Sequence, residues 1–215
     1  MNKRNESTAE RVAALSVSIL DRAGHIASMQ TAVLRAFGVK KIGRVTGTES
    51  VLADLLAHDR DVLIVNWLSK GEDWMELIEA VRSKQHCADP FVGVLVIAPD
   101  SYGERVKAML NAGVNSYLGM PFTPTDLRRH LTFLVRRDWV FVDSPAYFGP
   151  DRRRGGTGGP LGDERRGPSD AKILSGETLE RTRDEFRRAA RAAARAAKEA
   201  EMEARLRPVA AAGGG

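Results

Sequence analysis

The sequence predicts an α/β protein with a doubly wound, five-stranded parallel sheet. Residues 16–137 alternate between short apolar runs and stretches with apolar residues at three- and four-residue spacing. These two patterns are typical of buried strands and of amphipathic helices. Five strand–helix units in succession favour parallel pairing, since each helix carries the chain back across the sheet. We therefore expect helices on both faces of one sheet.

The strands are expected where apolar runs are shortest and most continuous. A run without polar interruption is typical of a parallel strand that is buried on both faces. The expected strands are residues 16–20, 42–45, 62–65, 91–97 and 116–118.

The helices are expected between these runs, where the apolar spacing changes. In the first of them Ile26, Met29, Val33 and Phe37 fall on one face, and Gly38 is a stop signal. Thr123-Pro124 is a start signal for the last of them. The expected helices are residues 26–37, 49–57, 73–83, 103–111 and 125–135.

The composition changes after residue 137. Residues 138–142 are expected to add a strand or to pack on the sheet edge, and residues 149–170 hold seven glycines and three prolines, as in an extended linker. Residues 177–207 are rich in Ala, Glu and Arg, which favour a helix. The expected organisation is an extension (1–15), a core domain (16–145), a disordered Gly/Arg-rich linker (146–174), a helix (175–207) and a disordered tail (208–215).

Composition points to a cytoplasmic protein. Of 215 residues, 43% are hydrophobic and 28% are charged, and no apolar stretch approaches the ~18 residues of a membrane span. The first residues carry no signal-peptide pattern. Cys87 is the only cysteine, so an intrachain disulfide is excluded, and four scattered histidines lack the spacing of a zinc site. We expect no metal, no cofactor and no membrane partner.

The positive charge is concentrated in the tail. Residues 1–145 hold 18 basic and 17 acidic residues, whereas residues 146–215 hold 15 basic and 11 acidic residues. Electrostatic attraction to an acidic partner is therefore expected mainly from the tail.

The order and spacing of the units resemble the receiver domain of response regulators, which has a flavodoxin-like fold. Asp21 ends the first strand, and residue 66 ends the third. The run from Asn111-Ala-Gly113 through Tyr117 to Pro121-Phe122 is similar to the family's stretch around its fifth strand. The resemblance covers about 120 residues and implies a role in two-component (phosphorelay) signalling.

The resemblance also implies a phosphorylation site, from which this sequence departs. The family uses two acids and an acceptor aspartate to hold Mg²⁺, a hydroxyl to bind the phosphoryl group, and a lysine to neutralise it. Four of these five groups are missing, so we expect neither phosphorylation nor Mg²⁺ binding, and no enzyme activity. The equivalent positions are Asp21 and Arg22 for the acids, Asn66 for the acceptor, Ala98 for the hydroxyl and Met120 for the lysine.

Two interpretations of Asn66 stay open. In one, the pocket is a permanently set switch in which the Asn66 amide bonds Arg22. In the other, an interaction scaffold has simply lost a chemistry that it no longer needs. Trp67 and Trp74 are expected to be buried rather than to stack on a ligand. The resemblance suggests a cis peptide at Met120-Pro121.

The tail contains an arginine repeat. Arg152, Arg153 and Arg154 form one cluster and Arg165 with Arg166 the other, each preceded by glycine and an acid. Arginine suits carboxylates and phosphates, so these residues are candidates for partner binding, or else part of a solvated linker. The neighbouring acids favour a protein partner over nucleic acid.

The terminal helix has small apolar residues at seven-residue spacing, from Leu179 and Phe186 to Ala193 and Ala200, and Arg183 interrupts it. Alanine buries little area, so a marginal or partner-induced helix is expected rather than a stable coiled coil.

The function that these observations favour is a phosphorylation-independent receiver. Such a protein would act as an adaptor for a histidine kinase, another regulator or a target protein, through residues 103–111, 116–118 and 125–135, with a homodimer as a further option. The alternative is a protein whose tail binds nucleic acid or an anionic surface, with the receiver as a dimerisation platform.

Overall fold

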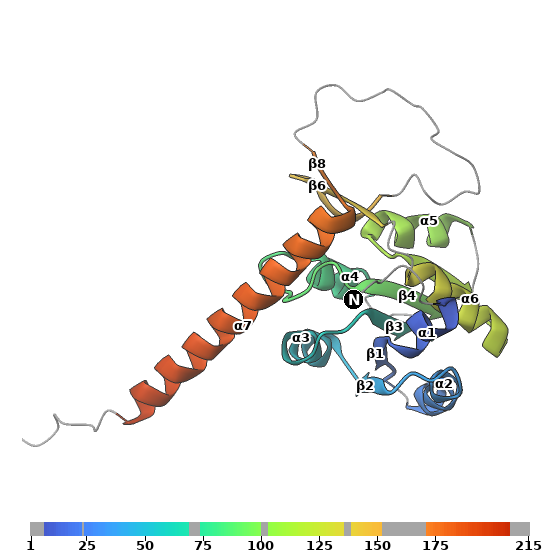
Figure 1. Cartoon of the computed structure of the whole chain (residues 1–215), viewed down its shortest axis with the longest axis horizontal. Helices are drawn as coiled ribbons and strands as arrows, with labels where there is room; N and C mark the ends of the chain where they lie inside the picture. Colours follow the sequence, from blue (N-terminus) through green and yellow to red (C-terminus); the bar gives the residue numbers. More distant parts are fainter. Residues whose placement is uncertain are drawn as a thin grey trace, which may run out of the picture.

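A five-stranded parallel sheet forms the centre of the molecule (Figure 1), as the sequence predicts. The computed structural model describes residues 7–22, 24–68, 74–99, 103–135, 139–151 and 171–206. The strand order is β2-β1-β3-β4-β5, so the chain reverses direction across the sheet at β1, as in a doubly wound fold. The strands are β1 (Ser16–Leu20), β2 (Lys41–Val45), β3 (Val62–Asn66), β4 (Gly93–Ala98) and β5 (Ser116–Gly119).

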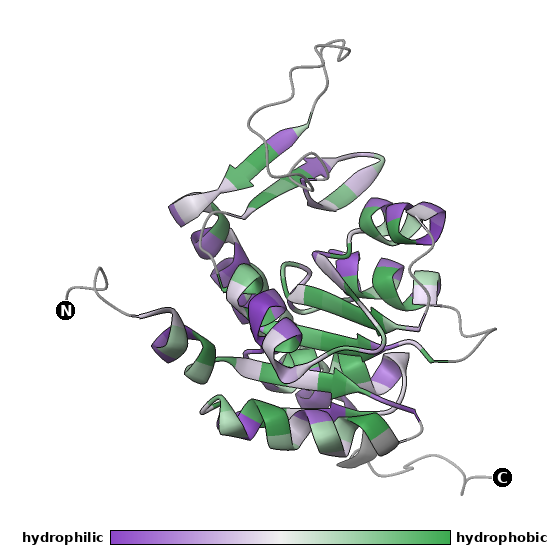
Figure 2. Ribbon diagram, turned by 90° about the vertical axis from the view of Figure 1, so that its right-hand side faces the viewer, coloured by the Kyte–Doolittle hydropathy of each residue, from purple (hydrophilic) through white to green (hydrophobic). Residues whose placement is uncertain are grey.

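Helices cover both faces of this sheet. One face packs against α1, α2 and α6, and the other packs against α3, α4 and α5. The hydropathy view shows apolar strands between helices whose outward sides are polar (Figure 2). The helices are α1 (Thr8–Ala13), α2 (His25–Ala36), α3 (Thr48–Ala57), α4 (Trp74–Arg82), α5 (Gly103–Ala112) and α6 (Pro124–Leu134).

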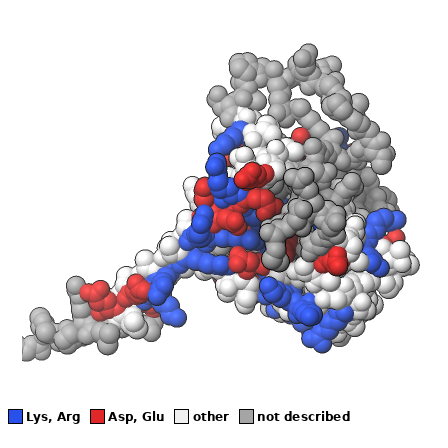
Figure 3. All heavy atoms as spheres, in the orientation of Figure 1, with Lys and Arg blue, Asp and Glu red and all other residues white. Residues whose placement is uncertain are grey.

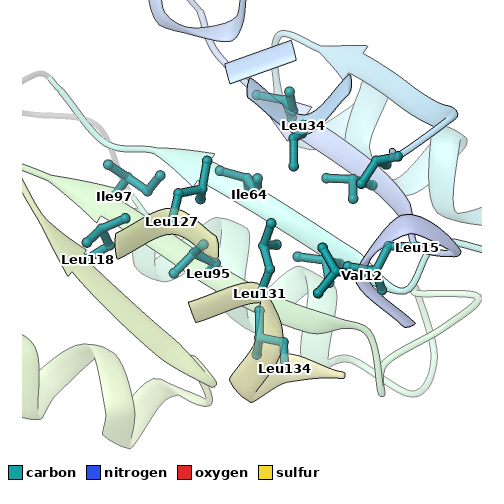
Figure 4. Close-up of a cluster of buried hydrophobic side chains, with 14 of the residues drawn as sticks. Val12, Leu15, Leu34, Ile64, Leu95, Ile97, Leu118, Leu127, Leu131 and Leu134 are labelled. Carbon is teal, nitrogen blue, oxygen red and sulfur yellow. The ribbon is translucent and has the colours of Figure 1, made fainter. Parts of the chain in front are cut away.

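The α2/α6 face shows how this core is filled (Figure 4). Leu127 and Leu131 recur one turn apart on α6 and are fully buried against Ile64 and Leu95 of the central strands. Because helices cover both faces, every residue of β3 is buried, which explains its uninterrupted apolar sequence.

The first helix was not predicted from the sequence. Ser7 and Glu10 form a capping box at its start, in which each side chain accepts a hydrogen bond from the other residue's backbone N–H. Val12 is 1% exposed and packs in the core cluster that α6 helps to form. The expected N-terminal extension is therefore a structured part of the core domain from residue 7 onward.

A second, smaller sheet follows the receiver-like fold. Its antiparallel order is β7-β6-β8, with β6 (Val140–Ser144), β7 (Tyr147–Pro150) and β8 (Lys172–Ser175). The prediction of a disordered linker over residues 146–174 was wrong at both of its ends, because β7 and β8 pair with β6. The expected domain boundary at residue 145 falls inside this sheet, and residues 152–170 lie outside the described ones.

Phe91 connects the two sheets. The sequence placed it in a strand, but β4 begins at Gly93. Phe91 instead packs against Phe141, Phe148 and Phe186, at ring-centre distances of 5.2, 5.0 and 5.7 Å. This aromatic cluster joins the main domain, the small sheet and the terminal helix.

The terminal helix α7 (Gly176–Leu206) agrees with the predicted extent of 175–207. Its first half lies against α3, β6 and β8, and its second half projects away from the body (Figure 1). Among the described residues no helix is both long enough and apolar enough to cross a membrane.

Candidate functional site

The predicted pocket residues gather at the carboxyl edge of the main sheet. Asn66 ends β3 and pairs with Ile97, the neighbour of Ala98 at the end of β4. Met120 follows β5, and its backbone N–H donates to the Ala98 carbonyl oxygen at 2.9 Å. Asp21 directly follows β1. Parallel pairing thus brings together residues that lie up to about a hundred positions apart, at the edge where such sheets place their ligands.

The side-chain amide of Asn66 is hydrogen-bonded to a second side-chain amide, that of Gln30 on α2. Gln30 Nε2 donates to Asn66 Oδ1 at 2.7 Å, and Asn66 Nδ2 donates to Gln30 Oε1 at 2.9 Å. Gln30 is fully buried and Asn66 is 6% exposed. This amide pair engages both polar atoms of the Asn66 side chain, which one of the two open interpretations assigned to Arg22, and Arg22 lies exposed.

Gln30 was missed in the sequence analysis. It lies on the helix expected at residues 26–37, four residues after Ile26 and three before Val33, and so on the apolar face, although glutamine is most often a surface residue. A polar residue on the inward side of an amphipathic helix is the signal that would have identified it, because buried amides need hydrogen-bond partners.

The one remaining acid of the pocket, Asp21, takes part in local structure. Its Oδ2 accepts a hydrogen bond from the backbone N–H of Ala27 at 2.8 Å, in the first turn of α2. A carboxylate at that place satisfies a free N–H and is favoured by the helix dipole. Asp21 is 4% exposed, and one of its two carboxylate oxygens is already engaged by the helix.

The remaining two positions present apolar side chains. Ala98 is 1% exposed and Met120 packs against the main core cluster. The Met120-Pro121 peptide is cis, as the resemblance suggested. Within the described residues no group of three His, Cys, Asp or Glu side chains is placed to hold a metal ion. The described residues at these positions supply no nucleophile, no second carboxylate and no ammonium group.

Trp67 lies beside this pocket. Its ring is 5.6 Å from that of Trp74, and the Arg105 guanidinium lies 5.9 Å from its ring centre. Both tryptophans are partly buried and pack against the core cluster on the α3/α4 side, which fits the expectation that they cover the sheet.

The opposite, amino-terminal edge of the sheet carries a second polar site that the sequence analysis did not identify. Asp89 is 1% exposed, and its Oδ2 accepts hydrogen bonds at 2.7 Å from Nη2 of both Arg183 and Arg187. Both arginines also donate to the Arg60 carbonyl oxygen at 2.8 Å. We call Asp89, Arg183, Arg187 and this carbonyl the Asp89 cluster.

The charges of the Asp89 cluster compensate each other. Burial alone raises the pKa of Asp89, but the two guanidinium groups outweigh it and hold that pKa below its usual value. Burial by itself lowers the pKa of Arg183, but the Asp89 carboxylate has the larger effect and holds that pKa above its usual value. Arg183, which interrupts the apolar seam in the sequence, therefore attaches α7 to the domain. Arginines at 183, 187 and 191 are the signal for this face.

The loop that presents Asp89 is itself held by a buried arginine. Arg82 donates to the carbonyl oxygens of Pro90, Val92 and Gly113 at 2.7 to 2.9 Å, and to Asn115 Oδ1 at 2.7 Å. Burial lowers the pKa of Arg82 to about 10. These four hydrogen bonds fix the backbone that follows Asp89 and connect it to the segment before β5.

The arginines of the predicted partner site, Arg152 to Arg154 and Arg165-Arg166, lie outside the described residues. Their role in partner binding stays a prediction. On α7, Arg183, Arg187 and Arg195 bind within the chain, and Arg191 donates to Asp59 at 2.9 Å.

The curated proteins with similar sequences are chemotaxis proteins of the CheY type. Over 80 residues the chain is 32% identical to a chemotaxis protein CheY homolog of Campylobacter jejuni, a match that covers 36% of this chain and 60% of that protein. Over 105 residues it is 25% identical to chemotaxis protein CheY-3 of Vibrio cholerae, covering 49% and 79%. The first of these matches spans less than two thirds of its relative's length. No family model matches the chain.

Solved structures give the same picture for the fold. Chemotaxis protein CheY4 of Vibrio cholerae is 21% identical with a TM-score of 0.50, covering 56% of this chain and 99% of that one. A Chloroflexus aurantiacus structure, solved as a candidate response regulator, is 27% identical with a TM-score of 0.50, covering 56% and 97%. The similarity takes in nearly all of those chains and slightly more than half of this one.

Proposed function

Because the chain carries a CheY-like response-regulator receiver domain of two-component signalling, we propose that it acts as a phosphorylation-independent adaptor. The hypothesis is a non-enzymatic, cytoplasmic protein that binds a histidine kinase, another regulator or a target protein. The observation that carries the proposal is the Asn66–Gln30 pair, which occupies the acceptor position with two mutually bonded amides.

The chemistry of the pocket supports this hypothesis. An amide nitrogen is no nucleophile, and Asn66 already uses its Oδ1 and Nδ2 on Gln30. Opening the pocket to an anion would break both of these buried hydrogen bonds, and each buried polar atom left unpaired costs about 1–3 kcal/mol. The apolar Ala98 and Met120 offer an incoming phosphoryl group nothing in return.

The partner surface that we favour is the one formed by α5, β5 and α6. The main contacts of α7 lie on α3, β6 and β8, away from that surface. The α5/β5/α6 surface exposes charges of both signs, with Glu104 and Lys107 on α5 and Arg128 and Arg129 on α6. A protein partner with a polar interface suits such a surface.

The first experiment tests the pocket. We would add Mg²⁺ and beryllofluoride, and separately acetyl phosphate, to the full chain, following tryptophan fluorescence and phosphorylation by intact mass. The expected result is no saturable response, because the pocket lacks both the metal ligands and the acceptor. The matched control carries Arg22→Asp, Asn66→Asp, Ala98→Thr and Met120→Lys together, and we expect it to gain a Mg²⁺-dependent response. A saturable response of the unaltered chain would overturn the phosphorylation-independent assignment.

The second experiment tests the adaptor role. Purified histidine kinases and receiver proteins of the same organism would be assayed for binding to the full chain by interferometry. We expect Lys107→Glu with Arg128→Glu to weaken binding at least tenfold, and the matched pair Lys40→Glu with Lys41→Glu, far from this surface, to leave it unchanged. Equal affinity for both double variants would contradict the surface assignment.

A further inference from the structure

The outer side of β2 is an open strand edge. Among the described strands β2 pairs only with β1, and it lies at one end of the five-stranded sheet. The Asp21 N–H donates to the Val45 carbonyl oxygen at 3.1 Å, so the backbone groups of Val45 face β1. Because backbone groups alternate in direction along a parallel strand, those of Ile42 and Arg44 face outward. Each residue presents one N–H donor and one C=O acceptor to a partner on that side.

Basic side chains surround this strand. Residues 22–48 contain five lysines and arginines and no acid, and all five are exposed. They are Arg22, Arg35, Lys40, Lys41 and Arg44. In Figure 3 basic side chains gather along the lower rim of the body, where Figure 1 places β2 and α2. On the α3 side of the strand, Asp54 binds Arg60 through both carboxylate oxygens at 2.8 Å, so this acid is already compensated.

We call the outer side of Lys41–Val45, together with Lys40, the β2 edge. We propose that the β2 edge binds an extended acidic peptide segment of a partner protein, which adds a strand to the main sheet. In this mode main-chain hydrogen bonds supply the affinity, and side chains select the partner. The two outer strands of the sheet are β2 and β5, so this site lies across the sheet from the α5/β5/α6 surface. It goes beyond the adaptor role and does not depend on whether the pocket is closed.

Both faces of an added strand would meet a basic side chain. Side chains alternate between the two faces of a sheet, so Lys41 and Arg44 point to opposite faces. Arg44 lies on the α2 side, where its Nη2 donates to the Gly24 carbonyl oxygen at 3.1 Å. Lys41 shares the α3 side with Gly43, whose missing side chain leaves room for the Arg60 guanidinium. An acidic residue on either face of the partner strand therefore gains an opposite charge across the pairing.

The same features disfavour other occupants. Charged side chains on an edge strand oppose pairing with strands that cannot compensate them. Two copies of this chain joined through their β2 edges would bring Lys41 and Arg44 beside the same basic residues, and like charges opposite each other are unfavourable. A nucleic acid would place phosphate oxygens against the outward carbonyl oxygens of Ile42 and Arg44, and both groups are acceptors. Alternating donors and acceptors match a peptide backbone instead.

Fluorescence anisotropy with the full chain tests the charge requirement. The probe is a short labelled peptide in which glutamate alternates with valine, and we expect it to bind at least tenfold more tightly than the same peptide with lysine in place of glutamate. Lys40→Glu with Lys41→Glu should weaken binding at least tenfold. Lys107→Glu with Arg188→Glu makes the same charge change at exposed positions of α5 and α7 and should bind like the parent. No binding of the glutamate probe, or equal losses in both double variants, would overturn the proposal.

N-methylation of the glutamate probe tests the strand geometry without altering the protein. Methyl groups on every second amide leave one hydrogen-bonding side of the extended peptide intact, and this probe should still bind. Methyl groups on every amide block both sides, and this second probe should lose at least tenfold in affinity although its charge is unchanged. Equal affinities of the two methylated probes would show that charge alone holds the peptide, which would refute strand addition.

Substitution at Ile42 tests the same hydrogen bonds from the side of the protein. Ile42→Pro removes the outward N–H, a change that an edge strand tolerates, whereas the matched Ile42→Ala keeps it. We expect Ile42→Ala to bind the glutamate probe like the parent and Ile42→Pro to lose at least tenfold, with circular dichroism confirming that both are folded. The methylated probes decide the question alone if Ile42→Pro is unfolded. Equal binding by both variants, or a labelled single-stranded DNA that binds the β2 edge more tightly than the peptide, would contradict the proposal.

Discussion

At the scale of single residues, the pairing of Asn66 with Gln30 decides what the pocket can hold. Two buried amides satisfy each other completely along one edge, and neither depends on a charge or an ion. The pocket is thus a stable part of the core rather than a vacancy.

Replacing Asn66→Asp should therefore destabilise the fold rather than restore the family's chemistry. The new carboxylate faces Gln30 Oε1 with an acceptor, so one hydrogen bond is lost and a charge is buried beside the core. We expect a loss of about 1–3 kcal/mol in the free energy of unfolding at pH 7, measured with urea. Asn111→Asp, at an exposed position of α5, is the matched control and should change it by less than about 0.5 kcal/mol. An Asn66→Asp chain as stable as the parent would contradict this account.

The reactivity of the Cys87 thiol depends on its burial, which the sequence does not show. Burial raises the pKa of its thiol to about 11, and the side chain is 4% exposed. Because the thiolate is the reactive form, the native chain should react very slowly with Ellman's reagent at pH 8, and rapidly in guanidinium chloride. Ala193→Cys supplies an exposed thiol as a positive control. Fast labelling of Cys87 in the native chain would show that the segment around it opens readily.

At the scale of elements, α7 docks through charge as well as through apolar area. Phe186 and Leu179 contact the aromatic cluster around Phe91, while Arg183 and Arg187 neutralise Asp89. A buried carboxylate with only one partner would be costly, and the second arginine adds hydrogen bonds to its remaining lone pairs. The docked position of the helix is specified by this combination.

Asp89→Asn should release the docked half of α7 without unfolding the main domain. Removing this acid takes away the buried counter-charge that both guanidinium groups share and leaves only Asp59, 3.5 Å from Arg187 Nε, which we expect to cost about 3 kcal/mol of docking free energy. Hydrogen exchange of the amides between residues 183 and 191 should quicken at least tenfold, while β3 and β4 keep their protection. Asp59→Asn, whose side chain is 57% exposed, is the control and should have little effect. Unchanged exchange in Asp89→Asn would mean that apolar contacts alone hold the helix.

Acid should release the same half of α7. The pKa of Asp89 is depressed in the folded state, so its contribution to docking is complete above its unfolded value of about 4 and is lost as pH falls through the depressed value. Hydrogen exchange of α7 measured between pH 6 and pH 2.5 should therefore rise relative to that of the main sheet only below about pH 4. The Asp89→Asn variant should lack this step. A step of equal size in both chains would assign the acid sensitivity to other groups.

At the scale of the whole molecule, the second sheet and α7 complete a core that the receiver-like fold leaves open. Phe91 belongs to the main domain, and Phe141 and Leu174 come from the small sheet, yet all three are nearly inaccessible to water. Removing the later elements would expose these side chains together. The receiver-like fold of this chain therefore depends on its C-terminal elements to bury part of its apolar surface.

Truncation should separate the two halves of the tail. A chain that ends at residue 145 loses β7, β8 and α7, exposes Phe91 and Phe141, and should lose about 3–6 kcal/mol of stability, at about 1.5–3 kcal/mol per large apolar side chain. A chain that ends at residue 195 keeps the docked half of α7 and should differ by less than about 1 kcal/mol. Both are measured by urea unfolding. A 1–145 fragment as stable as the longer chain would show that the second sheet adds no support.

The sequence alone determined the main fold because local patterns carry that information. Alternation between continuous apolar runs and helical spacing placed β1 at residues 16–20, as observed, and the remaining strands and helices of the main sheet within about two residues. The pattern is local because a buried parallel strand must be apolar throughout and a covering helix must be apolar on one side. The residues at the positions equivalent to the family's pocket were also read from the sequence, and their effect on phosphorylation stays a prediction.

Only the tertiary structure decided which polar groups meet. Gln30 and Asn66 are 36 residues apart, and Asp89 and Arg183 are 94 residues apart, so no local pattern links them. The short strand β8 and the six-residue helix α1 were missed for a related reason, since each is stabilised by contacts with distant elements rather than by its own periodicity. A buried amide or carboxylate must find its partner wherever the fold brings one. In this chain that requirement closed the pocket and attached the terminal helix.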